Sequence, residues 1–575
     1  MQLKNIPWVL LREELDRLDS ERVVERIWNR DHTVWSPDPA EISNRLGWLQ
    51  SHEEMKTALP EIEQFVEEVR ADGVKQVLLL GMGGSSLAPE VFGTIFGSRN
   101  GYPSLEVLDT TDPGAILHFE RKSDLKKTLI IVSTKSGGTV ETLSLMKYFY
   151  SKVSEEVGEE NAGQNFIAIT DPGSKLEEKA EALGFRKVFL NNPDIGGRYS
   201  SLSYFGLVPA GLLGIDLQTL LEKAKEMAVV SKAGDFSAKD GNTPALLGAA
   251  LSAMGKSGQD KITLIASEKI RPFGLWLEQL LAESTGKKGK GLLPVDSEPL
   301  LKAAEYGPDR LFIIFSLNQD PEMEETAKTM ANQGLPLIRL DLPDIYSLGG
   351  EMFRWMMATA IAGWSLQINP FDQPDVESAK VLARDLITEY EEKGRLKEAE
   401  PDFELDCFQV YLGCPRFKAN SLEEGWQGFF SALQQASTVK MGALPYVAIQ
   451  AYLQPDPETD RALQLLRQKI GSLYRVAVTV GYGPRFLHST GQLHKGDAGN
   501  GFFIQLTAED REDVIIPGGS GSGRRSISFG TLKKAQALGD WQALLDAGRK
   551  AIRFHIVSDA AGGIDKLTQA LHNQG

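Results

Sequence analysis

The segment VLLLGMGGSSLAPEVF at residues 77–92 decides the expected fold of this 575-residue chain. An apolar strand ends at Leu80, a glycine- and serine-rich loop follows at 81–86, and a helix is expected to begin near Leu87. Glycines allow close backbone approach and a helix start presents free N–H groups, so this loop can hold an anion. Three interpretations stay open: phosphate binding, dinucleotide binding with Asp109 at the ribose, and a plain tight turn.

Short apolar runs alternate with helix-length segments through most of the chain beyond residue 72. Such alternation is typical of βαβ units and of parallel sheets covered on both faces. The N-terminal region has helical apolar spacing and almost no glycine, which predicts a helical lead-in. The predicted fold class is α/β, with a lead-in at 1–71, two parallel-sheet αβα sandwich domains at 72–225 and 255–390, and an additional C-terminal α/β region at 395–575.

The composition narrows the classes of function. Charged residues make up 24% and hydrophobic residues 42%, as in ordinary folded proteins. A net charge of −16 argues against extended contact with a nucleic-acid backbone. No apolar run reaches the ~18 residues of a membrane span, and no secretory signal is recognisable. The only two cysteines, Cys407 and Cys414, favour a reducing compartment. We therefore expect a cytoplasmic protein with neither a nucleic-acid nor a membrane partner.

A second strand–loop–helix unit repeats the layout in TLIIVSTKSGGTVETLSLMKYF at 128–149. Its loop carries Thr134, Lys135, Ser136 and Thr139. Hydroxyls and amides at a helix start donate directional hydrogen bonds to a phosphate monoester, and the lysine adds a charge. The order Lys-Ser-Gly-Gly is not that of a Walker A loop, and an N-capped helix with an incidental lysine is the alternative. Two such loops in one parallel sheet can converge at its carboxyl edge.

Five segments together resemble the phosphoglucose isomerase branch of the sugar-isomerase (SIS) family. The family's specific signature GGRYS is matched in full at 196–200. The other matches are GMGGSSLAPE at 81–90, STKSGGTVET at 133–142, the glutamate segment LEQLLAESTGKKGKG at 277–291 and the lysine segment INPFDQPDVESAK at 368–380. The resemblance implies two SIS-type domains and reversible conversion of glucose 6-phosphate to fructose 6-phosphate, with no cofactor and no metal.

The resemblance also implies a residue for each chemical task. Isomerisation needs a carboxylate that moves a proton between C2 and C1, a cation beside the enediolate oxygen, and an acid/base that opens the ring. Glu283 is the implied carboxylate, Arg198 the cation and Lys380 the active-site lysine. Judged by composition alone, Glu283 and Lys380 would be solvated surface residues. The predicted binding set is Gly84, Ser85, Thr134, Lys135, Ser136, Thr139, Gln279 and Gln373.

The position of the histidine segment in this sequence differs from the family pattern. Members of the family carry the ring-opening histidine between the glutamate and lysine segments, but residues 284–379 contain none. HSTGQLHKG at 488–496 resembles the family's histidine segment with one residue removed, and the isomerase half of transaldolase–isomerase fusions shows a similar pattern. We therefore expect His488 to open the ring, with His494 as its structural neighbour. Two histidines without a role, or a metal pair, are the alternatives.

Two other functions compete with the isomerase. A phosphosugar-binding regulator would need the phosphate loops but neither Glu283 nor Arg198. An isomerase for mannose or amino-sugar phosphates would share most of the site. The loop Gly518–Gly523 with Arg524 and Arg525 is interpreted as a surface loop, with a second anion site as the alternative. A small sugar phosphate is the expected ligand, and a homodimer is open.

Overall fold

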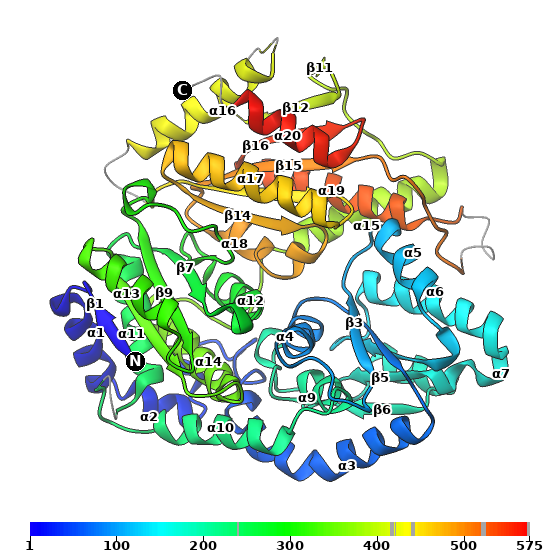
Figure 1. Cartoon of the computed structure of the whole chain (residues 1–575), viewed down its shortest axis with the longest axis horizontal. Helices are drawn as coiled ribbons and strands as arrows, with labels where there is room; N and C mark the ends of the chain where they lie inside the picture. The colour runs from blue at the N-terminus through cyan, green and yellow to red at the C-terminus, as the bar shows by residue number, and fades with distance from the viewer. Residues whose placement is uncertain (238–240, 415–418, 420, 439–442, 519–524, 572–575) are drawn as a thin grey trace.

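The computed structural model describes residues 1–237, 241–414, 419, 421–438, 443–518 and 525–571. Within these ranges the chain forms three β-sheets, with helices packed on both faces of each. In Figure 1 the first sheet lies at the right, the second at the left and the third, C-terminal sheet at the top. No helix in the described part of the chain is long and apolar enough to cross a membrane.

The first sheet is entirely parallel, in the order β3-β2-β4-β5-β6. Alternate residues of its central strands enter two different cores, which explains why they are almost continuously apolar. The strands are β2 (Gln76–Gly81), β3 (Ser104–Leu108), β4 (Thr128–Ser133), β5 (Phe166–Thr170) and β6 (Lys187–Leu190). The helices that matter for the site are α4 (Leu87–Phe96), α5 (Pro113–Lys122) and α6 (Val140–Val157).

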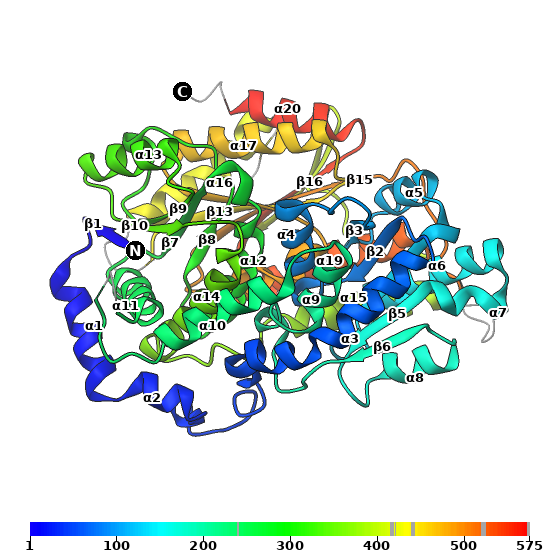
Figure 2. The same ribbon diagram turned by 60° about the horizontal axis from the view of Figure 1, so that its bottom comes forward.

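The second sheet has the order β1-β10-β9-β7-β8. Its parallel strands are β7 (Lys261–Ala266), β8 (Leu293–Val295), β9 (Arg310–Leu317) and β10 (Leu337–Leu342). The lead-in is helical in α1 (Trp8–Ser20), α2 (Val23–Trp28) and α3 (Ser51–Ala71), but its first residues add an unpredicted antiparallel edge strand, β1 (Gln2–Lys4). Figure 2 shows α1 beside α11 (Thr243–Lys256), so this part of the lead-in packs on a helix that precedes β7.

The third sheet has the order β11-β12-β16-β15-β13-β14. Its parallel strands are β13 (Tyr446–Tyr452), β14 (Ala477–Tyr482), β15 (Gly501–Ala508) and β16 (Lys550–Ile556), and the antiparallel strands β11 (Phe403–Leu405) and β12 (Phe408–Cys414) form one edge. One face packs on α16 (Leu422–Ser437), α17 (Pro457–Tyr474) and α20 (Ala560–Ala570). The opposite face packs on α18 (Gly491–Gly496) and α19 (Phe529–Asp546). The expected α/β class, with two parallel-sheet domains and a C-terminal α/β region, is confirmed.

Helix α15 (Glu377–Lys393) follows the second sheet in sequence but packs along α19 of the C-terminal region. The contact depends on Gly539, where a Cβ atom would lie 2.9 Å from Ala383 N and 3.0 Å from Ala379 O. Only a residue without a side chain lets the two helix backbones approach this closely. The predicted domain bounds stay a prediction, but the packing of α15 sets the position of Lys380.

Gly539→Ala is expected to destabilise the protein by about 1–3 kcal/mol, the usual cost of overpacking, and to lower turnover by displacing Lys380. Thermal unfolding and initial-rate kinetics measure the two effects. Gly425→Ala in α16 is the matched control, because the added Cβ would make only an ordinary 3.7 Å contact. Equal melting temperatures for Gly539→Ala and the parent would contradict this account.

Candidate active site

The two glycines of the first loop bring three distant segments together. A Cβ atom on Gly84 would lie 2.0 Å from Gly197 O, so the loop and the GGRYS turn touch through their backbones. Gly83 has φ +54°, and a Cβ there would lie 2.7 Å from both His488 O and Gln279 Nε2. The sequence predicts that this glycine-rich loop binds an anion. In the structure its glycines also allow other segments to pack closely against the backbone.

Arg198 is buried at the junction of the first and second sheets. Its Nε donates to Ser284 Oγ at 2.9 Å, and one of its terminal nitrogens donates to Pro370 O and Asp372 O, each at 2.8 Å. The other donates to Gln373 Oε1 at 3.0 Å and lies 3.3 Å from Glu283 Oε1. These contacts hold the guanidinium in one orientation beside the predicted carboxylate.

Gln279 connects the predicted carboxylate with the histidine segment. It lies one turn before Glu283 on α12 (Phe273–Thr285), and its Nε2 donates to Glu283 Oε2 at 3.1 Å and to His488 O at 2.8 Å. The Glu283 side chain is only 13% exposed, so it is not the solvated helix residue that composition alone suggests. Glu283, Arg198, Gln279 and the backbone of His488 therefore form one contiguous hydrogen-bonded group.

Beside this group lies a cavity of about 530 Å³. Four predicted residues line it: Ser136, Thr139, Lys380 and His488. They come from the loop after β4, from α15, and from the short 3₁₀ helix η9 (Arg485–His488). The volume is within the range of small-molecule sites. Three parts of the chain that are far apart in sequence thus converge on one space large enough for a sugar phosphate.

Glu141 is a residue of this cavity that the sequence reasoning missed. Its Oε1 lies 3.0 Å from His488 Nε2 and accepts a 2.7 Å hydrogen bond from Gln536 Nε2. Burial acts to raise the pKa of Glu141, but His488 and the nearby Lys380 outweigh burial and lower it. The carboxylate therefore stays ionised and orients the imidazole. In the sequence, nothing distinguishes Glu141 from any other acidic residue in the first turn of a helix, where the helix dipole favours a negative charge.

Some predicted residues lie elsewhere. The Lys135 ammonium pairs with Asp171 and donates to Pro193 O at 2.7 Å. Gln373 contacts Arg198, and neither Gln373 nor Arg198 lines the 530 Å³ cavity. The Thr134 hydroxyl lies 2.9 Å from that of Thr139, and Ser85, in the first loop, is buried. The two loops are thus adjacent to the site, but Lys135 is already neutralised by a carboxylate.

The remaining candidates from the sequence do not enter the site. His494 is buried on α18, where burial lowers its pKa well below the usual value, and it packs against Phe503. Cys407 is a free, buried thiol. Arg524 and most of the Gly518–Gly523 loop lie outside the described residues. In the part of the chain that is described, no three His, Cys, Asp or Glu side chains are placed to hold a metal ion.

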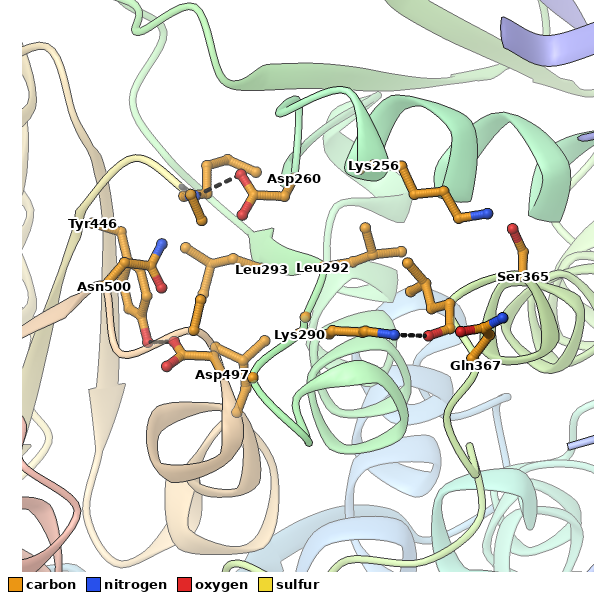
Figure 3. Close-up of a pocket in the computed structure, with 18 of the residues that line it drawn as sticks. Lys256, Asp260, Lys290, Leu292, Leu293, Ser365, Gln367, Tyr446, Asp497 and Asn500 are labelled. Carbon is orange, nitrogen blue, oxygen red and sulfur yellow. Dashed lines mark hydrogen bonds and ion pairs between the residues drawn. The ribbon is translucent and has the colours of Figure 1, made fainter. Parts of the chain in front are cut away.

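Another cavity, of about 580 Å³, lies between the second sheet and the C-terminal region. Figure 3 shows it between Lys256, Lys290, Leu293, Tyr446 and Asp497. Its acidic side chains are already partnered, Asp260 by Lys261 at 2.6 Å and Asp497 by Tyr446 Oη at 2.7 Å. None of the predicted site residues lines it. The chemistry predicted from the sequence therefore belongs to the 530 Å³ cavity and the Glu283 group.

Parallel-sheet domains with hydroxyl-rich strand–loop–helix turns, joined at a buried Arg–Glu pair, define a phosphosugar isomerase fold of the SIS type. Residues 46–292 match the model of a family described as phosphoglucose isomerase. Through that region the chain resembles the phosphoglucose isomerase family, and the resemblance seen in its motifs is confirmed.

Several proteins named glucose-6-phosphate isomerase are similar to this chain. A glucose-6-phosphate isomerase of Methanocaldococcus jannaschii is 28% identical over 353 residues, covering 55% of this chain and 85% of the relative. One from Thermus thermophilus is 28% identical over 390 residues, covering 60% and 90%. The solved structure of a Chlamydia trachomatis glucose-6-phosphate isomerase is 17% identical with a TM-score of 0.56, covers 66% of this chain and 86% of that one, and shows the fold alone.

Proposed function

We propose that this protein interconverts glucose 6-phosphate and fructose 6-phosphate by proton transfer through an enediolate. The match to the phosphoglucose isomerase family model and the named relatives support this reaction. The observation that supports it is the Glu283–Gln279–His488 connection. Glu283 lies 3.3 Å from Arg198, and Gln279 links it to the backbone of His488, which lines the cavity. A base and a cation in this arrangement are the parts that an aldose–ketose isomerase needs.

The proposed isomerisation step uses Glu283 and Arg198. Glu283 removes the proton from C2 of the open-chain aldose and returns it to C1, and the O2 hydroxyl proton moves to O1. The aldehyde and its neighbouring hydroxyl thereby become a primary alcohol at C1 and a ketone at C2. The negative charge that develops on oxygen is stabilised by the Arg198 guanidinium, which remains charged throughout. Because Arg198 is already held by Ser284 and two backbone carbonyls, it needs no reorganisation when that charge appears.

The proposed ring-opening step uses His488 and Lys380. The ionised Glu141 accepts the Nε2 proton of His488, which leaves Nδ1 free to exchange a proton with the sugar. Ring opening moves a proton from O1 to the ring oxygen O5, and an imidazole can both accept and donate one. Lys380 lines the same cavity and supplies positive charge opposite Glu141. The phosphate is proposed to lie against the Ser136–Thr139 loop.

A coupled assay tests the proposed function. Purified protein is given glucose 6-phosphate, and fructose 6-phosphate is followed through a phosphofructokinase-coupled readout, with mannose 6-phosphate as the alternative substrate. Production of fructose 6-phosphate mainly from glucose 6-phosphate is expected. Saturable binding of both sugar phosphates without turnover would instead identify a phosphosugar-binding regulator, because a sensor needs the loops but not a Glu283–Arg198 pair.

For this protein a homodimer stays an open prediction, and we also propose a cytoplasmic location and no nucleic-acid partner. The net charge of −16 supports the last point, because a polyanion would be repelled. The two cysteines and the soluble sugar-phosphate substrate support the cytoplasmic location. Sedimentation of the purified protein at several concentrations measures the assembly, and a monomer at all of them would contradict the homodimer.

Ser136→Ala and Thr139→Val are expected to raise KM about tenfold and to weaken inhibition by inorganic phosphate, because each removes a hydrogen bond to a charged group. Lys135→Ala should have a smaller effect, since Asp171 already neutralises its ammonium. Ser104→Ala, on the exposed start of β3, is the control. Unchanged phosphate inhibition in Ser136→Ala and Thr139→Val would remove the loop from the phosphate site.

A further inference from the structure

Lys287 is a buried cation for which the mechanism above has no role. Its side chain is 1% exposed, and its Nζ donates to Asp372 O at 2.5 Å and to Asp372 Oδ1 at 2.8 Å. It lies four residues after Glu283, in a tight turn where Lys287 and Lys290 form a β-bridge and Lys288 has φ +54°. This turn directs Lys287 inward and leaves Lys288 exposed.

Lys287 and Arg198 share one acceptor. The Asp372 carbonyl that accepts from Lys287 also accepts from Arg198, at 2.8 Å, and the neighbouring Gln373 and Pro370 accept from Arg198 as well. The loop at 369–375 is therefore the support on which the guanidinium rests. Lys287 connects that support to the turn that follows the predicted base.

The arrangement is costly unless it serves the site. Removing an ammonium from water and placing it near a guanidinium opposes folding, and Asp372, with a side chain 29% exposed, and Glu283 offset this cost. A neutral hydrogen-bond donor would anchor the carbonyl at a lower desolvation cost. A second cation behind Glu283 and Arg198 adds positive potential where the enediolate charge develops.

We infer that Lys287 is a positioning residue for the isomerisation step, one that ties the 369–375 loop under Arg198 to the turn after Glu283. This inference rests on the proposed function, because it assigns the effect to the proton-transfer step. Lys287 acts through Asp372 and Arg198 and not on the substrate. Its loss should therefore misplace the guanidinium while leaving the phosphate loop, more distant in the fold, intact.

Burial, followed by the nearby Arg198, lowers the pKa of Lys287 to about 8, against the opposing effects of Asp372 and Glu283. The charged groups that face Lys287 are Arg198 from the GGRYS turn, Asp372 from the 369–375 loop and Glu283 from α12. Raising the pH through about 8 deprotonates Lys287 in the folded protein, so the ion pair with Asp372 is lost. Because this ion pair holds the 369–375 loop under Arg198, its loss is expected to lower kcat on the alkaline side.

The test compares Lys287→Met, Lys287→Arg and the exposed control Lys288→Met on the coupled assay from about pH 6 to pH 10. Lys287→Met is expected to lower kcat about 10–100-fold with KM nearly unchanged, as for a misplaced catalytic group, and to lose the alkaline fall. Lys287→Arg should recover most of the turnover and move the fall to higher pH. Lys288→Met should behave as the parent.

Parental kcat and pH dependence in Lys287→Met would overturn the inference, and so would an unmoved alkaline fall in a folded Lys287→Arg. If Lys287→Met does not fold by thermal melting, the Lys287→Arg profile alone decides. A parent protein with no isomerase activity would instead contradict the proposed function, so the two failures are distinguishable.

Discussion

Glu283→Gln lowers kcat by about 10²–10⁴-fold and leaves sugar-phosphate binding nearly unchanged, if Glu283 is the base that moves the C2 proton. Gln preserves the shape of the side chain and can still accept the hydrogen bond from Gln279, but it lacks the basic oxygen and the negative charge beside Arg198. The measurement is kcat on the coupled assay, together with the dissociation constant of a sugar phosphate. The solvent-exchange rate of the C2 proton should fall in proportion, because the same residue performs both transfers.

The same helix supplies a matched control for this substitution. Burial, with a contribution from Asp296, raises the pKa of Glu278 to about 8, so Glu278 is mainly protonated at neutral pH. Glu278→Gln therefore exchanges one neutral group for another, five residues before Glu283 on α12. Its kcat at pH 7 should stay close to that of the parent. Full turnover in a folded Glu283→Gln variant would exclude Glu283 as the base.

His488→Ala depresses activity on the cyclic substrate while sparing exchange of the C1/C2 proton in open-chain substrate, if His488 opens the ring. The expected loss is about 10²–10⁴-fold for the cyclic form, the usual contribution of a positioned acid/base. The two steps separate because ring opening moves a proton between oxygens, whereas isomerisation moves one between carbons. The decisive measurement is the ratio of the cyclic to the open-chain rate.

Glu141→Gln extends the test to the orienting carboxylate. Gln keeps a hydrogen-bonding group near His488 Nε2 but removes the charge that holds the imidazole, so the rate ratio should fall less than in His488→Ala. His118→Ala, on the exposed part of α5, serves as the unrelated histidine control. A constant rate ratio in His488→Ala would return the 488–496 segment to a structural role.

The two glycine-rich loops proposed to bind phosphate are the part of this site that sequence alone predicts best. The expected strand end at Leu80 and helix start at Leu87 lie within one residue of the ends observed for β2 and α4. Apolar runs, glycines and helix-start residues act on their immediate neighbours, so a short window contains the information. The pairing of Glu283 with Gln279 is readable for the same reason, because one helical turn separates them.

Tertiary structure alone decides which distant side chains meet. His488 reaches the site because Arg485, on the same 3₁₀ helix, pairs with Glu90 and lies 3.1 Å from Asp109 at the carboxyl edge of the first sheet. The Glu141–His488 pair joins residues that are 347 positions apart. No local pattern indicates such a contact, because its energy depends on the packing of whole domains.

The same distinction separates Lys135 from Lys380. The sequence placed Lys135 in a phosphate loop, but only the fold brings Asp171 and Pro193 O close enough to engage its ammonium. The outcome for Lys380 is the opposite. Composition alone predicts a surface lysine, but the packing of α15 on Gly539 of α19 brings Lys380 to the cavity wall. The sequence by itself therefore determined the strand–loop–helix units, the fold class and the resemblance to the family. The tertiary structure decided which charges are neutralised and which face the cavity, because burial and pairing arise only when distant elements pack together.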